Sequence, residues 1–132
     1  MLSVMADANK HVVVGVDDDF RVRESIESLL ESAGYATRVF ASAEEFLHSG
    51  TLAAATCLIT DVRMREMDGI ELQRRIRLEH PKLPVIFISA HHDEKTRRRA
   101  LEDGAVGFLY KPFDGVDLLE AIKVALTRAE QR

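Results

Sequence analysis

Carboxylate, hydroxyl and ammonium groups end four short apolar runs of this sequence. Asp17 and Asp18 follow the first run, Asp61 follows the second, Ser89 closes the third and Lys111 follows the fourth. A buried carboxylate is costly unless a charge or ligand beside it needs that group. Several carboxylates suit a hard cation such as Mg²⁺, and an ammonium beside them suits a phosphoryl group. These residue types therefore indicate a cation-dependent phosphoryl site centred on Asp61, if the fold brings the run ends together.

The apolar run before Asp61 predicts a buried strand over residues 57–61. The run is short, and breakers flank it, with Gly50-Thr51 before it and Asp68-Gly69 after it. In open α/β sheets, ligands and chemistry collect outside the carboxyl ends of the strands. Asp61 therefore stands where a working carboxylate is expected.

Strand-like and helix-like segments alternate five times along the chain, with short connections. Continuous apolar runs indicate strands buried on both faces, and apolar residues three and four apart indicate amphipathic helices. Such alternation predicts an α/β fold, a doubly wound (βα)5 sandwich around a five-stranded parallel sheet. The expected strands are 11–16, 35–40, 57–61, 85–89 and 105–110, and the expected helices are 20–33, 42–48, 68–78, 93–102 and 114–129.

Composition limits the class of protein. The length of 132 residues suits one domain, and 46% hydrophobic with 30% charged residues is typical of a globular protein. The net charge of −4 does not indicate bulk nucleic-acid binding. Cys57 is the single cysteine, so we expect a buried, reduced thiol. Without a signal peptide or a bilayer-length apolar run, a cytoplasmic location is expected. We expect a disordered lead-in over 1–10, one domain over 11–129 and a tail or linker start over 130–132.

Four motifs at the expected strand ends resemble the receiver domain of two-component response regulators. They are Val-Asp-Asp-Asp at 16–19, Thr-Asp-Val-Arg-Met at 60–64 with Met-Asp-Gly at 67–69, Ile-Ser-Ala at 88–90, and Tyr-Lys-Pro-Phe at 110–113. Each motif alone is weak, but all four in this order are highly specific and cover roughly residues 11–128. The FixJ-type subgroup is the most similar, through the first motif and Phe-Ala-Ser-Ala-Glu-Glu-Phe at 40–46. The resemblance implies the strand order 2-1-3-4-5.

The resemblance also implies a role for each acid. Asp61 matches the phosphoacceptor, which attacks the phosphoryl group on the phosphohistidine of a histidine kinase. Asp17 and Asp18 match the acidic pair that holds Mg²⁺, and Arg63 matches the position whose backbone carbonyl also binds this metal. The alternative for Asp17 to Asp19 is a set of helix-capping acids, but one cap needs only one aspartate.

Three further residues match the family's groups for reading the phosphoryl group. Lys111 matches the lysine that pairs with it, Ser89 the switch hydroxyl, and Phe108 the switch aromatic three residues before the lysine. Taken alone, Lys111 would be interpreted as a solvated charge, Ser89 as a turn residue and Phe108 as a core side chain. Their expected position at the same edge of the sheet favours a role in the site instead. Arg65 departs from the family, which usually has proline there. Its guanidinium either screens the acids weakly or points to solvent.

The resemblance implies a signalling module rather than a metabolic enzyme. We expect a sensor histidine kinase as partner, self-catalysed phosphorylation from a phosphodonor and slow self-dephosphorylation. Phosphorylation would rearrange the 93–129 face and expose a homodimer surface there. A C-terminal DNA-binding output domain, as FixJ-type receivers usually have, would lie outside this chain, and no membrane partner is expected.

Two other functions stay open on the residues alone. An aspartate-nucleophile phosphatase of the haloacid dehalogenase type needs an acid two residues after its nucleophile, where this chain has Arg63, which cannot act as a general acid. A receiver-like interaction module that ignores phosphate would have lost an acid or the lysine, and none is lost. Arg97 to Arg99 indicate a solvated helix face, with a partner or DNA contact as the alternative, and His91-His92 indicate exposed loop residues.

Overall fold

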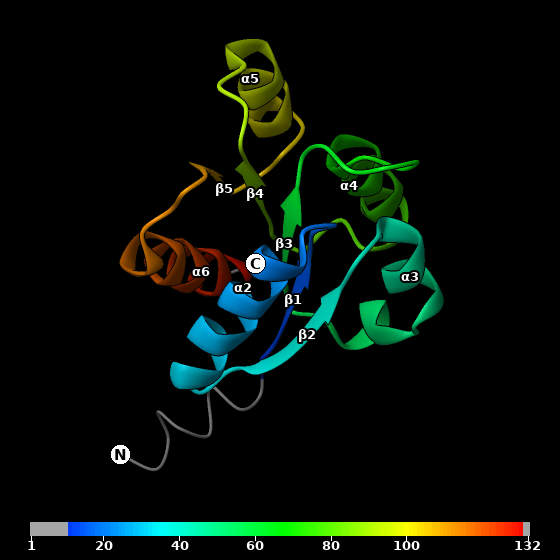
Figure 1. Ribbon diagram of the computed structural model, residues 1–132. Helices are drawn as coiled ribbons and strands as arrows, with labels where there is room; N and C mark the ends of the chain where they lie inside the picture. Colours follow the sequence, from blue (N-terminus) through cyan, green and yellow to red (C-terminus); the bar gives the residue numbers. More distant parts are fainter. Residues whose placement is uncertain (1–10, 131–132) are drawn as a thin grey trace.

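One five-stranded parallel sheet forms the centre of the molecule (Figure 1). The strands are β1 (Val12–Val16), β2 (Ala36–Phe40), β3 (Cys57–Asp61), β4 (Val85–Ser89) and β5 (Gly107–Tyr110). Their order is β2-β1-β3-β4-β5, which confirms the order implied by the resemblance. The computed structural model describes residues 11–130, so the lead-in expected over 1–10 and the last two residues lie outside the described part.

Five α-helices connect or follow these strands within the described residues. They are α2 (Phe20–Ser32), α3 (Ala43–His48), α4 (Gly69–Glu79), α5 (Glu94–Glu102) and α6 (Gly115–Glu130). Every strand and α-helix begins and ends within two residues of its expected bounds. A 3-10 helix, η1 (Thr51–Ala54), was not expected from the sequence. No described helix is long and apolar enough to cross a membrane.

Helices cover both faces of the sheet (Figure 1). On one face α2 and α6 bury Ile26 and Ile122, and on the other α3, α4 and α5 bury Phe46, Leu72 and Ala100. The inner strands are apolar on both sides because both of their faces are covered, as the continuous runs predicted. The Cys57 thiol is free and fully buried, and burial raises its pKa to about 12, so it is an inert core group.

Side-chain caps fix the loops that leave the carboxyl edge of the sheet. Ser42, Asp68, Asp93 and Asp114 accept backbone N–H groups from the first turns of the helices that follow them. Each cap satisfies a donor that has no partner inside its helix. The loops after β2, β3, β4 and β5 are therefore held at their helix ends, close to the residues that could carry chemistry.

Candidate functional site

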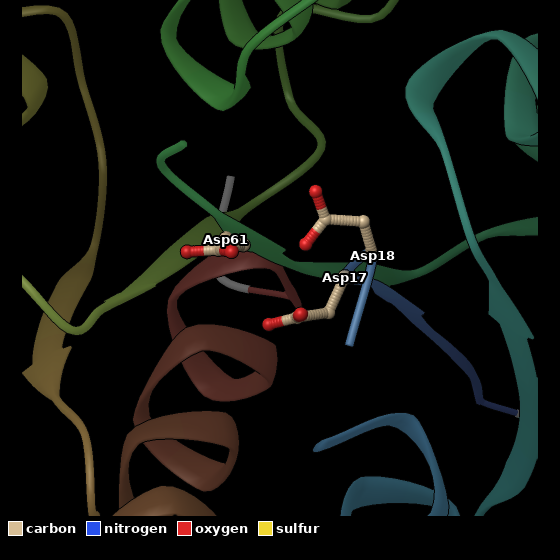
Figure 2. Close-up of side chains that lie close together, drawn as sticks. All are labelled: Asp17, Asp18 and Asp61. Carbon is tan, nitrogen blue, oxygen red and sulfur yellow. The ribbon is translucent and has the colours of Figure 1, made fainter. Parts of the chain in front are cut away.

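The sheet register places acids from two neighbouring strands side by side. Val16 of β1 pairs with Thr60 of β3, so the residues that follow, Asp17 after β1 and Asp61 at the end of β3, stand at the same level of the sheet. Figure 2 shows Asp17 and Asp18 after the end of β1 and Asp61 at the end of β3. One carboxylate oxygen from each of the three lies within 4.8 Å of the other two. The structure thus brings these three side chains together over one edge.

The three consecutive acids after β1 have different roles. Asp19 is the helix cap, because its Oδ1 accepts the Arg21 N–H at 2.9 Å. Asp17 is fully buried, and its Oδ1 accepts the Asp19 N–H at 2.8 Å. The Arg23 Nη1 donates to the Asp17 carbonyl at 2.9 Å, which ties the loop to α2. Asp18 is exposed, so its carboxylate faces both the cluster and water.

Lys111 connects two of the clustered carboxylates. Its Nζ lies 2.8 Å from Asp17 Oδ2 and 3.4 Å from Asp61 Oδ2. The Lys111 N–H donates to the Ser89 carbonyl at 2.8 Å and so fixes the end of β5 on β4, and the peptide bond to Pro112 is cis. The lysine side chain therefore reaches past the end of β4 to carboxylates that come from β1 and β3.

Burial and like charges disfavour ionisation of Asp61. Burial raises the pKa of its carboxyl, the Asp17 charge adds to the rise, and Lys111 opposes it, so the pKa lies at about 6. For Lys111, burial lowers the pKa, but Asp17 and Asp61 outweigh burial and hold that pKa above its ordinary value. Three acids against one ammonium leave an excess of negative charge, which a bound cation would neutralise.

The chain after Asp61 turns back onto it. The Gly69 N–H donates to the Val62 carbonyl at 2.8 Å, which closes the loop between β3 and α4. A Cβ on Gly69 would lie 2.2 Å from the Asp61 carbonyl oxygen, so a side chain at this position would force the loop away. Arg63, whose carbonyl the resemblance assigns to the metal, is an exposed residue of this closed loop.

The structure does not join Ser89 to Asp61. Ser89 is buried, and its Oγ donates to the His91 carbonyl at 3.1 Å and accepts the His91 N–H at 3.0 Å. Phe108 is half-buried and packs against Phe87, with 6.0 Å between the ring centroids. Both residues therefore lie on the strands that flank the acidic cluster on one side, and the Ser89 hydroxyl bonds within its own loop.

The donor set at this edge fits Mg²⁺. Magnesium prefers oxygen ligands in an octahedron and keeps several waters, so it is held by a few carboxylates rather than by a complete protein cage. Asp17, Asp18 and Asp61 offer three carboxylates, and the exposure of Asp18 leaves room for water. An ammonium donates only, so Lys111 is a counter-charge and not a ligand.

Sequence reasoning missed three side-chain contacts between elements of the fold. Glu44 Oε2 accepts the Met67 N–H at 3.2 Å, and the His92 ring stacks on Tyr110 with 4.0 Å between centroids. Gln73 is buried, and its Nε2 donates to two backbone carbonyls at the end of α5 at 3.4 Å. Only Gln73 carries a sequence signal, because it is a polar residue at helical spacing on an apolar face.

Comparison with known sequences decides the family. The sequence profile described as the response regulator receiver domain matches residues 13–123, from β1 into α6. The chain belongs to this receiver family. The four-motif resemblance is therefore confirmed, and membership supports a receiver function in two-component signalling over the phosphatase alternative.

Individual relatives confirm the FixJ-type assignment of this receiver. It is 37% identical over 120 residues to the transcriptional regulatory protein FixJ of Bradyrhizobium diazoefficiens, covering 91% of this chain and 58% of FixJ. It is 43% identical over 121 residues to the response regulator protein TmoT of Ectopseudomonas mendocina, covering 92% of this chain and 55% of TmoT.

A solved structure agrees with these relatives. The response regulator StyR matches the receiver with a TM-score of 0.85 and 41% identity, over 93% of this chain and 62% of that one. The receiver spans little more than half the length of the curated relatives it matches.

Proposed function

We propose that this receiver accepts a phosphoryl group on Asp61 with the help of Mg²⁺ held by Asp17, Asp18 and Asp61. The observation that supports it is the set of three carboxylates within 4.8 Å, with Lys111 between two of them. Asp61 is the better nucleophile of the buried pair. Asp17 uses Oδ1 for the Asp19 N–H and Oδ2 for Lys111, whereas Asp61 Oδ1 accepts no hydrogen bond from the described residues.

The chemistry gives each side chain a task. An Asp61 oxygen attacks the phosphorus of a phosphohistidine or a small acyl phosphate. The new O–P bond forms as the donor's P–N or P–O bond breaks, and the leaving group keeps the electron pair. The Lys111 ammonium neutralises charge on the transferred phosphoryl oxygens, and Mg²⁺ supplies further neutralisation and alignment when bound. Water then slowly attacks the phosphorus, the Asp61 O–P bond breaks with its electron pair left on the carboxylate, and inorganic phosphate leaves, so the module is a timed switch rather than a turnover enzyme.

The output surface comprises α5, β5 and α6. The apolar residues of α5 are only Ala100, which is buried, and Leu101, which is half-buried, so few apolar contacts oppose its movement. Phosphorylation draws the Ser89 hydroxyl from its His91 contacts towards the phosphoryl group, and Phe108 follows. These movements expose a homodimer surface on the 93–129 face.

A histidine kinase is the upstream partner, and a DNA-binding output domain is the downstream one. The kinase supplies the phosphohistidine that the acidic edge is built to attack. The output domain lies outside this chain, and the regulatory names of relatives such as FixJ, together with their greater length, support it.

A small phosphodonor tests the covalent step. With acetyl phosphate and Mg²⁺, we expect intact-mass measurement to show one added phosphoryl group on the wild type and none on Asp61→Asn. Asp117→Asn is the matched control, because Asp117 is an exposed aspartate in the first turn of α6, outside the cluster. Equal labelling of Asp61→Asn would remove the assignment, and an unlabelled wild type would favour the phosphate-independent interaction module.

Metal binding is tested without any phosphodonor. Mg²⁺ binds only the folded site, so millimolar Mg²⁺ should raise the thermal midpoint of the wild type. Asp18→Asn should remove most of this rise, while Asp117→Asn should keep it. An unchanged wild-type midpoint would mean that the three carboxylates do not form a metal site.

A further inference from the structure

The loop between β3 and α4 is held from outside by one side chain. Within the described residues, Glu44 of α3 makes the only side-chain hydrogen bond to residues 62–68 from another helix or strand, from Oε2 to the Met67 N–H at 3.2 Å. Glu44 is half-buried, so this bond is partly shielded from water. The two residues are 23 positions apart in the sequence, so the contact is tertiary.

The loop needs such a contact because its backbone is strained. Glu66 has φ 62°, in the left-handed region that glycine adopts freely and other residues adopt at a cost. A bend through Arg65 and Glu66 would ordinarily close with the Met67 N–H donating to the Met64 carbonyl. Here that N–H donates to Glu44 instead. A strained conformation persists only where its surroundings determine it, and Glu44 supplies one such constraint.

The held loop borders the acidic cluster. Asp18, Asp19, Glu44, Arg65 and Glu66 line a hollow of about 580 Å³ at this edge, so Glu44 and the cluster acid Asp18 face the same space. The loop begins directly after Asp61, and its other end is closed by the bond from Gly69 to Val62. A shift at Met67 is therefore transmitted to a short segment anchored beside the metal ligands.

We propose that Glu44 is a positioning residue for Mg²⁺ binding. Its side chain fixes the β3–α4 loop, and with it the Arg63 backbone, in the geometry that the cation needs. The inference rests on the proposed function, because it concerns the same metal site. Residues that orient metal ligands without touching the metal commonly alter affinity about tenfold or more when they are removed.

Three substitutions separate the hydrogen bond from the charge. Glu44→Gln keeps the acceptor oxygen and the length but loses the charge, whereas Glu44→Asp keeps the charge but is one methylene too short. Glu44→Ala removes both. Glu45→Ala is the control, because Glu45 is the exposed neighbour on α3 and its side chain makes no hydrogen bond to the described residues.

The first measurement is the Mg²⁺ dissociation constant of each variant, by calorimetric titration of the unphosphorylated protein. We expect it to rise about tenfold in Glu44→Ala and Glu44→Asp, and to stay within about twofold of wild type in Glu44→Gln and Glu45→Ala. Wild-type affinity in Glu44→Ala would overturn the proposal. A Glu44→Gln variant as weak as Glu44→Ala would also overturn it, because charge attraction would then be the cause.

The second measurement needs neither metal nor phosphate. Amide exchange at Met67 in metal-free protein should be about tenfold faster in Glu44→Ala and Glu44→Asp than in wild type, since one hydrogen bond is lost. Unchanged exchange would overturn the positioning role. A wild type that binds no Mg²⁺ would instead remove the proposed metal site, and exchange at Met67 would then decide alone whether Glu44 holds the loop.

The third measurement separates positioning from a general loss of structure. Phosphorylation by acetyl phosphate at saturating Mg²⁺ should proceed at the wild-type rate in Glu44→Ala, with only the half-saturating Mg²⁺ concentration raised. A lower maximal rate with unchanged Mg²⁺ dependence would contradict the proposal.

Discussion

Within β3, residues from Cys57 to Thr60 are buried in a packed interior, whereas Asp61 is buried among like charges at the carboxyl edge. The interior residues gain from exclusion of water, and Asp61 loses by it, because burial and Asp17 both oppose its ionisation. The neighbouring loop adds Glu66, a left-handed residue without the freedom of glycine. The interior therefore stabilises the fold, while the edge holds a buried carboxylate and a left-handed residue that both cost stability.

Because of this difference, substitutions in the two regions should change the stability of the protein in opposite directions. Removing atoms from the interior should destabilise the protein, because a packed core leaves a cavity when it is trimmed. Removing charge or strain from the edge should stabilise the protein without ligand. Natural sites commonly keep such locally unfavourable features because function requires them.

The largest expected effect lies in the interior. Ile122→Ala on α6 should lower the free energy of unfolding by about 2–5 kcal/mol, because the side chain is fully buried against the sheet. Val124→Ala on the same helix is the control, since Val124 is 39% exposed and should change stability by about 0.5 kcal/mol or less. Denaturant unfolding measures both. Equal losses of stability in the two variants would mean that the buried side of α6 does not form the core on that face of the sheet.

The next largest effect is a gain in stability at the carboxyl edge of the sheet, and this gain depends on pH. The folded-state pKa of Asp61, about 6, lies above the ordinary value of 3.8. Protonated Asp61 therefore contributes stability that is fully present below about pH 4 and lost as the pH rises through 6. Without Mg²⁺, Asp61→Asn should be more stable than wild type at pH 7, on the order of 1–2 kcal/mol.

The control for this prediction is the same pair of proteins at pH 4, where the advantage of Asp61→Asn should disappear. Unfolding in a chelator across this range provides the comparison. A difference that does not change with pH would assign the effect to shape or hydrogen bonding rather than to charge.

Relief of backbone strain should give a smaller gain. Glu66→Gly should raise the free energy of unfolding by about 0.5–1 kcal/mol, because glycine adopts positive φ freely but also gains freedom in the unfolded chain. Glu66→Ala keeps the strain and is the control, with no comparable gain expected. A loss of stability in Glu66→Gly would mean that the Glu66 side chain contributes more than its backbone costs.

The smallest change in stability is expected from a substitution at Arg65. Proline at position 65 would restrict the unfolded loop, so Arg65→Pro should stabilise by about 0.4–1 kcal/mol if the local φ lies near −65°. Arg65 is exposed and borders the hollow that Asp18 also lines, so its charge lies on the acidic side of the molecule. Denaturant unfolding in high salt suppresses the electrostatic effect of losing the Arg65 charge, so the stability that remains is the gain from the restricted backbone. A clear destabilisation would show that the loop follows a path proline cannot take.

Much of the fold was predictable because its signals are local. Apolar runs and helical spacing placed every described strand and α-helix to within two residues, and the four motifs identified the edge where Asp17, Asp61 and Lys111 meet. The 3-10 helix over Thr51–Ala54 was not predicted, because a turn of this length carries no hydrophobic periodicity. The start of β5 was placed early, at Ala105 rather than Gly107, because apolar composition continues beyond the paired residues.

The sequence by itself determined the elements, the family and the identity of the acids, since these depend on residue types at fixed short spacings. Only the tertiary structure decided that Lys111 lies between Asp17 and Asp61, that Ser89 bonds to His91, and that Glu44 holds Met67. Those facts depend on strand register and on the packing of helices against the sheet. They arise from contacts between residues far apart in the chain, and no local pattern encodes the distance between such partners.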